Sequence, residues 1–352
     1  MDTLLLFSHL VLGALGVLGV AASKPESLLE QVLSVLLSLV IVWVVSRVSP
    51  KRIARVSPAA YVVMLILLIL VLIIGISPEG SDAKRWLLIP GLGLTVQPSE
   101  FMKVVVSGYL AGFFYNHMGR WEIWRPMFVI GLAAALILVE PNVSTTLFIF
   151  ALSLTIMLAA GTTLMRLASI SVSAALIALL LGGLTLNQYS YIQERFEAMV
   201  DTWGEQEQAD GISYQSVRAQ RTLINAGFFG IGPGRPVRVP EADTDMIAIS
   251  IGQSLGFTGI ISLVMMYILI AGRGIRIAAV HAGPGSLLAA GATAYICGQA
   301  ALNLLVATGY FPVTGVVLPF VSHGFNNLVS VAIAMGFLQS AYRQARLGGH
   351  EL

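Results

Sequence analysis

Hydrophobic residues occur along the chain in long runs, each about as long as a membrane-crossing helix. A window of about 19 residues separates these runs into spans. The fifth span is short, and the turn Glu140-Pro141-Asn142 leads directly into the sixth. The pattern predicts an all-α polytopic membrane protein with about ten transmembrane helices. The predicted spans are 4–22, 28–46, 59–76, 99–116, 127–140, 143–160, 167–186, 246–271, 287–309 and 325–342.

Composition supports the same fold class. Of the 352 residues, 57% are hydrophobic and 11% are charged, against roughly 25% charged in soluble domains. So few charges could not cover the surface of a soluble fold of this size. The net charge of +2 is too small to indicate a nucleic-acid partner. The single cysteine, Cys297, excludes an internal disulfide and a thiolate metal cluster.

Basic residues predict the orientation of the spans. With the N-terminus in the cytoplasm, the inner segments carry eleven lysines and arginines, and the short outer loops carry three. This asymmetry follows the positive-inside rule, so both termini are expected in the cytoplasm. The inner residues are Arg47, Lys51, Arg52, Arg55, Arg120, Arg125, Arg166, Arg273, Arg276, Arg343 and Arg346, and the outer ones are Lys24, Lys84 and Arg85.

A large outer loop, residues 187–245, precedes the eighth span. A connection of this length is usually functional or disordered. It ends Pro240-Glu241-Ala242-Asp243-Thr244-Asp245, so three acids reach the membrane surface together. Burial and the neighbouring acids would raise the pKa of Asp245, as a general base near neutrality requires. The alternative is a helix N-cap formed by Thr244 or Asp243.

Span four opens with the polar sequence Gln97-Pro98-Ser99-Glu100-Phe101-Met102-Lys103. Pro98 suits a first helical turn, which Gln97 or Ser99 would cap. Glu100 and Lys103 are three residues apart, so they share a helix face and can pair. Ionisable side chains inside a bilayer are costly and need a reason. Two interpretations remain open: a snorkelling pair at the outer interface, or one wall of a polar cavity.

Irregular backbone is predicted between spans nine and ten. The segments Pro312-Val313-Thr314-Gly315 and Leu318-Pro319-Phe320-Val321-Ser322-His323-Gly324 contain two prolines and two glycines that break regular helix. Such backbone is tolerated in a membrane only where protein or a cavity covers it. His323 on its own favours a structural role. The glycine-rich run at 230–234 contains a proline and is expected outside, which argues against a nucleotide site.

The ten-span layout and a series of motifs resemble the FtsW/RodA/SpoVE (SEDS) family. The similarity covers nearly the whole chain in the right order, as one SEDS-type transmembrane domain over 1–352. The motifs are Lys84-Arg85-Trp86, Gln97-Pro98-Ser99-Glu100-Phe101-x-Lys103, Tyr214-Gln215, Phe229-Gly230-x-Gly232, Pro240-Glu241-Ala242-x-Thr244-Asp245, Leu255-Gly256-Phe257, Pro312-Val313-Thr314-Gly315 and Leu318-Pro319-Phe320.

This resemblance implies a peptidoglycan glycosyltransferase of the cytoplasmic (inner) membrane. Such an enzyme polymerises lipid II at the outer face during cell division or elongation and releases undecaprenyl diphosphate. It works with a class B penicillin-binding protein, which is a transpeptidase. The catalytic carboxylate falls on Asp245. A divalent cation, Mg²⁺ or Mn²⁺, would suit a diphosphate and could be held by carboxylates. The implied substrate-binding residues are Arg85, Trp86, Gln97, Ser99, Glu100, Lys103, Tyr214, Gln215, Glu241, Thr244, Ser322 and His323.

The sequence departs from the family pattern at four places. The usual His before Thr-Asp is Asp243, and the usual acidic pair that follows is Gln253-Ser254. The usual Pro-Asp-x-Gly reads Pro141-Asn142-Val143-Ser144, and the usual Ser-Tyr-Gly-Gly-Ser reads Ser322-His323-Gly324-Phe325-Asn326. These changes affect the expected substrate contacts and leave Asp245 in place. The Pro-Glu-Ala sequence near the end of the loop favours the division-type FtsW branch over the elongation-type RodA branch.

Two other functions stay open. A transporter that flips lipid II needs paired polar residues near the bilayer midplane, where most predicted spans are bare. A non-catalytic scaffold of a division complex needs no acid at position 245. Substitution of Asp245 would separate this scaffold from the enzyme.

Overall fold

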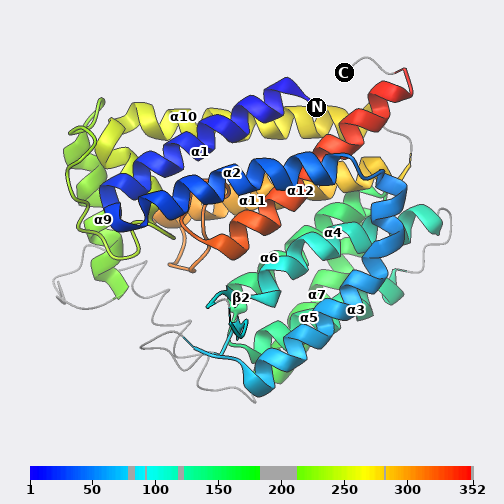
Figure 1. Cartoon of the computed structure of the whole chain (residues 1–352). Coiled ribbons are helices and arrows are strands. Elements are labelled where there is room, and N and C mark those ends of the chain that lie inside the picture. Colours follow the sequence, from blue (N-terminus) through cyan, green and yellow to red (C-terminus); the bar gives the residue numbers. More distant parts are fainter. Residues whose placement is uncertain (78–83, 92, 118–122, 183–211, 281–282, 350–352) are drawn as a thin grey trace.

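The computed structural model describes residues 1–77, 84–91, 93–117, 123–182, 212–280 and 283–349. Helices dominate it (Figure 1). The helices are α1 (Thr3–Ser23), a 3-10 turn (Pro25–Ser27), α2 (Leu28–Ser46), α3 (Pro50–Ile74), α4 (Pro98–Asn116), α5 (Trp124–Val139), α6 (Val143–Ala159), α7 (Leu164–Gly182), α9 (Ile212–Ala226), α10 (Ile247–Val280), α11 (Pro284–Ala307) and α12 (Phe325–Leu347).

The all-α polytopic fold predicted from the sequence is confirmed. Each of the ten predicted spans coincides with a helix, and α9 lies within the predicted outer loop. Among the described residues, five helices are both long and apolar enough to cross a membrane, namely α1, α2 with its preceding turn, α3, α10 and α11. Shorter apolar helices lie in α5, α6 and α7. The first part of the predicted outer loop, 187–211, lies outside the described residues.

Three predicted boundaries are wrong by several residues. Helix α3 begins at Pro50 rather than 59, α10 continues to Val280 rather than 271, and α12 continues to Leu347 rather than 342. A hydropathy window counts polar helical turns as loop, which explains all three differences. Helix α3 has its own start signal: the Ser49 hydroxyl accepts from the Arg52 amide, and proline fills the first helical position.

Helices α4 and α11 lie in the middle of the bundle. Helix α11 packs against α4, α6, α10 and α12, while α1 packs on α10 and α2 packs on α12. Both chain ends lie at the same end of the bundle (Figure 1), called here the termini end. Helix α9 lies at the opposite end, called here the loop end. The apolar side chains of α2 and α3 are largely exposed, as expected of helices that face lipid.

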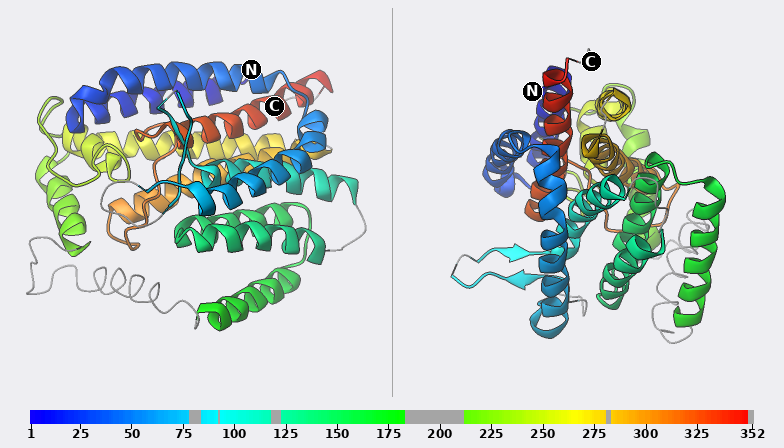
Figure 2. Two further views of the ribbon diagram at one scale, coloured as in Figure 1. Left: turned by 60° about the horizontal axis from the view of Figure 1, so that its bottom comes forward. Right: turned by 90° about the vertical axis from the view of Figure 1, so that its right-hand side faces the viewer.

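A small hairpin precedes α4 and projects from the bundle (Figure 2). Strand β1 (Leu87–Leu88) pairs antiparallel with β2 (Thr95–Val96). The Asn326 amide, at the start of α12, donates to the Thr95 carbonyl at 3.0 Å. This bond attaches the hairpin to the last helix and so fixes the point at which α4 starts.

Helix α10 is broken at Gly256, whose φ of 67° and ψ of −154° are not helical. A Cβ at this position would lie 2.3 Å from the Gly230 nitrogen, so another residue would not fit. The Ile231 and Gly232 amides donate to the carbonyls of Gln253 and Ser254, at 2.9 and 3.2 Å. The glycine-rich run at 230–234 therefore satisfies backbone carbonyls beside the break in α10, which gives it a structural role.

Candidate active site

The polar start of α4 forms a buried ion pair. Lys103 Nζ lies 2.8 Å from Glu100 Oε1 and donates to Gln299 Oε1 at 2.8 Å. Lys103 is 3% exposed and Glu100 is 9% exposed. A snorkelling lysine would extend its ammonium to water, so that interpretation is wrong. The pair is part of the interior, and its role as one wall of a polar cavity stays a prediction.

The start of α4 differs in detail from its prediction. Pro98 occupies the first helical turn as expected, and Gln97 precedes it as the N-cap residue. The Gln97 side chain makes no capping hydrogen bond. The Ser99 hydroxyl is fully buried and has no hydrogen-bond partner among the described residues. The prediction that Gln97 or Ser99 caps this helix is therefore wrong. The positive end of the helix still favours the Glu100 carboxylate in the first turn.

Helix α12 closes the ion pair from the other side. The Asn327 amide donates to Glu100 Oε2 at 2.8 Å, and the Ser330 hydroxyl donates to the Glu100 carbonyl at 2.8 Å. The Tyr295 hydroxyl lies 3.0 Å from the Ser330 hydroxyl. Lys103 Nζ also lies 5.3 Å from the centre of the Tyr295 ring. A buried ion pair needs such additional partners to offset its desolvation.

Two amides on α11 lead from the ion pair toward Asp245. The Gln299 amide donates to the Val317 carbonyl at 2.9 Å. One turn further, the Asn303 amide donates to the carbonyls of both Asp245 and Val316, at 2.7 and 2.6 Å. Gln299 and Asn303 are both 0% exposed. Neither was identified from the sequence, although residues 295, 299 and 303 recur every four positions on one helix face, which was an available signal.

Asp245 lies in a tightly turned segment, residues 240–246, just before α10. Glu241 has a φ of 55°, which is uncommon for a residue with a side chain. Its carbonyl accepts from the amides of Thr244 and Met246, at 3.1 and 2.9 Å. A Cβ at Gly315 would lie 3.5 Å from Asp245 Oδ2. The Asp245 carboxylate therefore faces the backbone of the α11–α12 loop (residues 308–324).

The other two acids of this segment have partners of their own. The Thr244 hydroxyl donates to Glu241 Oε2 at 2.7 Å. The Asp243 carboxylate pairs with Lys24 Nζ at 3.6 Å, across to the end of α1. The three acids thus point to different partners. The prediction that Glu241 and Asp243 raise the pKa of Asp245 stays a prediction.

The α11–α12 loop brings Ser322 and His323 to the same segment. The Ser322 hydroxyl donates to the Thr244 carbonyl at 2.7 Å and accepts from the Leu318 amide at 2.7 Å. The His323 amide donates to the Asp243 carbonyl at 2.8 Å. This bond involves only the main chain of His323, so the structural and the substrate-binding roles of its side chain both stay predictions. Ser322 and Thr244, both predicted to bind substrate, are directly bonded to each other.

Side chains from α2 and α10 hold this loop in place, in addition to Gln299 and Asn303 on α11. The Gln31 amide on α2 donates to the Val321 carbonyl at 3.1 Å, and the Tyr267 hydroxyl on α10 donates to the Pro319 carbonyl at 2.7 Å. Phe320, between them, has a φ of 65° and is 1% exposed. Irregular backbone in this position agrees with the rule that protein must cover it inside a membrane.

The predicted spans contain more buried polar side chains than the sequence analysis indicated. His9 lies inside α1, is 1% exposed, and its Nε2 is 2.8 Å from the Ser38 hydroxyl on α2. Its ring lies 4.3 Å from that of Phe320. A hydropathy window averages His9 and Ser38 with the apolar residues around them on α1 and α2, so it does not show the pair.

Arg85 and Trp86 lie beside the hairpin and have partners there. Arg85 donates to the carbonyls of Glu140 and Pro141, at 3.1 and 2.5 Å. Trp86 pairs with Ile76 in an isolated bridge. Arg85 thus secures the turn between α5 and α6. The substrate-binding role of Arg85 and Trp86 stays a prediction.

Glu140, in that turn, is 1% exposed, and neither of its carboxyl oxygens has a hydrogen-bond partner within the described ranges. Burial raises the pKa of the Glu140 carboxyl to about 8, although the nearby Arg85 charge opposes the rise. The acid is therefore mostly neutral at pH 7. Glu140 was not identified as a site residue, because a sequence does not show which side of a turn is buried.

The remaining predicted residues lie at the loop end. Tyr214 and Gln215 belong to α9, and the Gln215 amide donates to the Pro240 carbonyl at 3.3 Å. This contact connects α9 to the segment that carries Asp245. The side chain of Tyr214 is outside the described part of the structure.

The carboxylates do not converge on a metal site. In the part of the chain that the structure describes, no group of three or more His, Cys, Asp or Glu side chains is placed to hold an ion. Glu241 and Asp243 face Thr244 and Lys24 instead of Asp245. The protein residues described here therefore do not build a divalent-cation site by themselves.

Comparison with known proteins identifies the relatives of this chain. The family model described as "Cell cycle protein", FtsW/RodA/SpoVE, matches residues 4–347. A probable peptidoglycan glycosyltransferase FtsW of Allochromatium vinosum is 32% identical over 282 residues, or 76% of this chain and 68% of the relative. The protein of the same name in Trichlorobacter lovleyi is 30% identical over 286 residues, covering 78% of this chain and 73% of the relative.

Solved structures share the fold. One, described as "Structural coordination of polymerization and crosslinking by a peptidoglycan synthase complex", gives a TM-score of 0.80 at 24% identity and covers 98% of both chains. The rod shape determining protein RodA of Thermus thermophilus gives a TM-score of 0.71 at 22% identity and covers 97% of both chains.

Proposed function

Since the chain belongs to the FtsW/RodA/SpoVE family of cell cycle proteins, we propose that it is a peptidoglycan glycosyltransferase. It polymerises lipid II into glycan strands at the outer face of the cytoplasmic membrane and releases undecaprenyl diphosphate. Relatives that are at least 30% identical bear the name of this activity. Their FtsW name and the Pro-Glu-Ala sequence favour a role in division over elongation.

One observation carries the proposal most directly: the polar line from Asp245 to the buried ion pair. Asn303 binds the Asp245 carbonyl, Gln299 lies one turn away on the same helix, and Lys103 binds Gln299. This line lies inside an otherwise apolar bundle and toward its loop end. Buried polar groups of this kind in a membrane protein mark a substrate or ion site more often than a structural need.

In the proposed reaction, Asp245 is the general base. The hydroxyl of the acceptor sugar attacks the anomeric carbon of the donor and must lose its proton as the bond forms. A carboxylate within hydrogen-bond reach takes that proton, a contribution of roughly 10²–10⁴-fold. The departing diphosphate needs positive charge, which Lys103 and Arg85 would provide. The polyprenyl tails stay in lipid, so the substrates enter sideways from the membrane.

The remaining predicted contacts fit this arrangement as substrate-binding groups. The Ser99 hydroxyl is buried without a hydrogen-bond partner among the residues that the structure describes, and so is Oδ1 of Asn303. Such orphaned polar atoms are expensive unless a ligand or water satisfies them. Asn303 and Gln299 are therefore added to the predicted set of substrate-binding residues given by the sequence.

A divalent cation would be held here by Asp245 together with the substrate, and it would supply positive charge to the departing diphosphate. Mg²⁺ is often held by one or two carboxylates together with substrate phosphates, so a site without a full protein cage is consistent with it. Chelation followed by Mg²⁺ or Mn²⁺ addition, with binding of lipid II and polymerisation both measured, would test this. Unchanged binding and activity in chelator would remove the cation from the proposal.

The transporter alternative receives no specific support. Among the described residues the polar line reaches Tyr295 and Ser330, and the His9 ring of the His9–Ser38 pair packs against the buried Phe320. The scaffold alternative predicts that Asp245 is dispensable. Polymerisation of purified lipid II, with the parent and Asp245→Asn proteins compared, decides between enzyme and scaffold.

A class B penicillin-binding protein is the proposed partner, and the termini are proposed to be cytoplasmic. The eleven-to-three distribution of basic residues supports this orientation. Membrane-impermeant thiol labelling in a Cys297→Ala background should modify Glu205→Cys and leave Lys51→Cys unmodified. The reverse labelling pattern would contradict the proposed orientation.

Full polymerisation activity in the absence of the transpeptidase would contradict the proposed dependence on a partner.

A further inference from the structure

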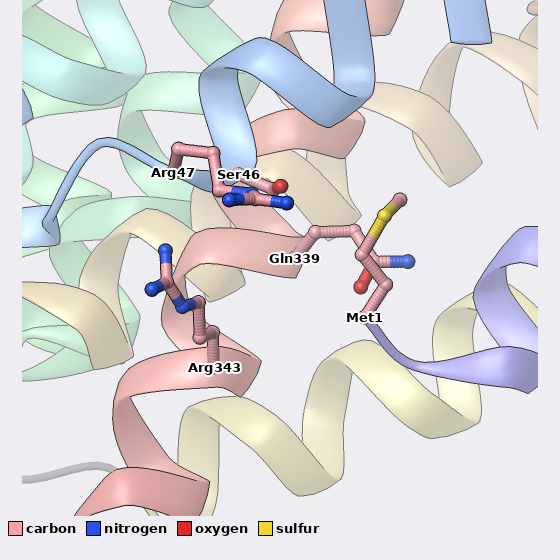
Figure 3. A pocket seen from close by; sticks show the side chains of 5 residues that line it. All are labelled: Met1, Ser46, Arg47, Gln339 and Arg343. Carbon is pink, nitrogen blue, oxygen red and sulfur yellow. The ribbon is translucent and has the colours of Figure 1, made fainter. Parts of the chain in front are cut away.

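A cavity of about 330 Å³ lies at the termini end of the bundle, away from the proposed active site. The start of α1 and the last turns of α2 and α12 surround it (Figure 3). Arg47 and Ser46 lie on one side, and Arg343 reaches toward it from the other (Figure 3). Its lining residues are Met1, Ser46, Arg47, Gln339 and Arg343.

The base of this cavity is fixed by a buried amide. Gln339 is 0% exposed, accepts from the Asp2 amide at 2.7 Å and donates to the Asp2 carbonyl at 3.2 Å. The Asp2 carboxylate in turn pairs with Arg273, whose Nε lies 3.0 Å away. The cavity therefore lies between helices whose relative positions are fixed, and it is more than a gap between mobile side chains.

Within the described part of the chain, no acid compensates the positive charge of the cavity. Among the described residues of this end, Asp2 is the one acid, and Arg273 already neutralises it. Neither Arg47 nor Arg343 forms an ion pair with an acid in that part of the chain. Two guanidinium groups around one cavity favour an anion, and their planar pairs of N–H donors match phosphate oxygens.

The surroundings indicate that the anion is attached to a lipid. The Arg47 guanidinium lies 4.6 Å from the centre of the Trp43 ring, and Trp43 is exposed. Tryptophan and arginine at a helix end are typical of the level of lipid headgroups. Exposed apolar side chains continue from there along α1 and α2, including Phe7 and Val40. Acyl chains would lie against these side chains.

We propose that this cavity binds the phosphate headgroup of an anionic phospholipid from the leaflet at the termini end. Arg47 and Arg343 contact the phosphate oxygens from two sides, and the acyl chains lie on the exposed faces of α1 and α2. Basic pockets between helices near the cytoplasmic surface bind anionic headgroups in this way. The site is separate from the polar line that carries the proposed glycosyltransferase activity.

The test measures lipid binding to the purified, full-length protein in detergent, with native mass spectrometry as the readout. Dioleoylphosphatidylglycerol, dioleoylphosphatidylcholine and inorganic phosphate are titrated separately. The parent protein should bind phosphatidylglycerol at least tenfold more tightly than phosphatidylcholine. The Arg47→Ala/Arg343→Ala variant should lose about tenfold or more in that affinity, since each basic residue contributes about 1 kcal/mol at a lipid surface.

The matched control is Lys51→Ala/Arg346→Ala, which removes the same charge from exposed positions outside the cavity. It should bind phosphatidylglycerol within about twofold of the parent. The Arg47→Lys/Arg343→Lys variant keeps the charge and loses the paired donors, so its affinity should be intermediate.

Three results would overturn the proposal. Equal losses in the test and control variants would mean a diffuse basic surface. Equal affinity of the parent for both phospholipids would mean that the net negative charge of the headgroup is not recognised. Displacement of phosphatidylglycerol by millimolar inorganic phosphate would mean a site for a free anion. If a variant fails to fold, the affinities of the parent protein for the two phospholipids still test the proposal.

Discussion

The loop end and the termini end of the bundle are built differently. At the loop end, side chains bind main-chain carbonyls of irregular segments, as Asn303 does with Asp245 and Ser322 does with Thr244. At the termini end, regular helices continue beyond the apolar spans, and a charged pair, Asp2 with Arg273, joins them. Polar contacts at the loop end thus position backbone and a carboxylate, while those at the termini end join helices. Substitutions at the two ends should therefore separate activity from stability.

The largest expected effect is that of Asp245→Asn. The amide keeps the shape of the carboxylate and its acceptor oxygen but cannot take a proton. Polymerisation of lipid II should fall by about 10²–10⁴-fold, while membrane insertion and purification remain normal. The matched control, Asp243→Asn, should be milder, because that carboxylate pairs with Lys24. If the Asp245→Asn variant polymerised lipid II at the parent rate, the proposed role of Asp245 as general base would be wrong.

Lys103→Met should affect both activity and stability. It leaves Glu100 buried without its cation, and removal of one partner from a buried pair costs about 3–5 kcal/mol. The double variant Glu100→Gln/Lys103→Met should recover much of the thermal stability, because no uncompensated charge remains. Its polymerisation should stay low, since the positive charge is still absent. Melting temperature and lipid II turnover are the two measurements. Recovery of activity together with stability would make the pair purely structural.

A third pair of variants removes a side-chain hydrogen-bond donor at each end of the bundle. Asn303→Leu removes the donor to the Asp245 and Val316 carbonyls, and Ser340→Val removes the donor to the Val48 carbonyl at the termini end. Each carbonyl left unsatisfied should cost about 1–3 kcal/mol. Asn303→Leu should also lower the turnover number about tenfold, because the Asp245 backbone is released. Equal turnover in the two variants would show that the loop end does not position the base.

These contrasts also explain how much of the molecule could be predicted from its sequence. Spans were predictable because lipid imposes long apolar runs. The position of Asp245 just before α10 was predictable for the same reason, while its catalytic role, which the family resemblance implies, stays a prediction. The polar turns of α3, α10 and α12 were not, since hydropathy counts them as loop. Gln299 and Asn303 were also missed. Single amides in apolar helices acquire meaning only when folding brings them to Lys103 and Asp245, which are far away in sequence.

At the termini end, Asp2→Asn should change stability without changing catalysis. The amide removes the charge that pairs with Arg273, which is partly exposed and can reach water. The expected loss is about 1–3 kcal/mol, below that of a fully buried pair. Lipid II turnover per folded molecule should equal that of the parent. A turnover loss as large as that of Asn303→Leu would mean that the two ends are coupled rather than separate.

The smallest effect is expected at Glu140, the loop-end acid that has no hydrogen-bond partner among the described residues. Burial raises the pKa of its carboxyl from an ordinary 4.5 to about 8. Between those values the folded protein holds a proton that the unfolded chain releases. The free energy of unfolding therefore falls as pH rises from about 4.5 to 8, and the stabilising contribution is complete only below that window.

Glu140→Gln imitates the neutral acid at every pH. Its melting temperature should match that of the parent near pH 5 and exceed it by about 2 °C or more at pH 8. Glu26→Gln, an exposed loop-end control, should follow the parent throughout. Parallel profiles for the parent and Glu140→Gln would show that Arg85 compensates this acid as fully as Arg273 compensates Asp2, and the electrostatic difference between the two ends would disappear.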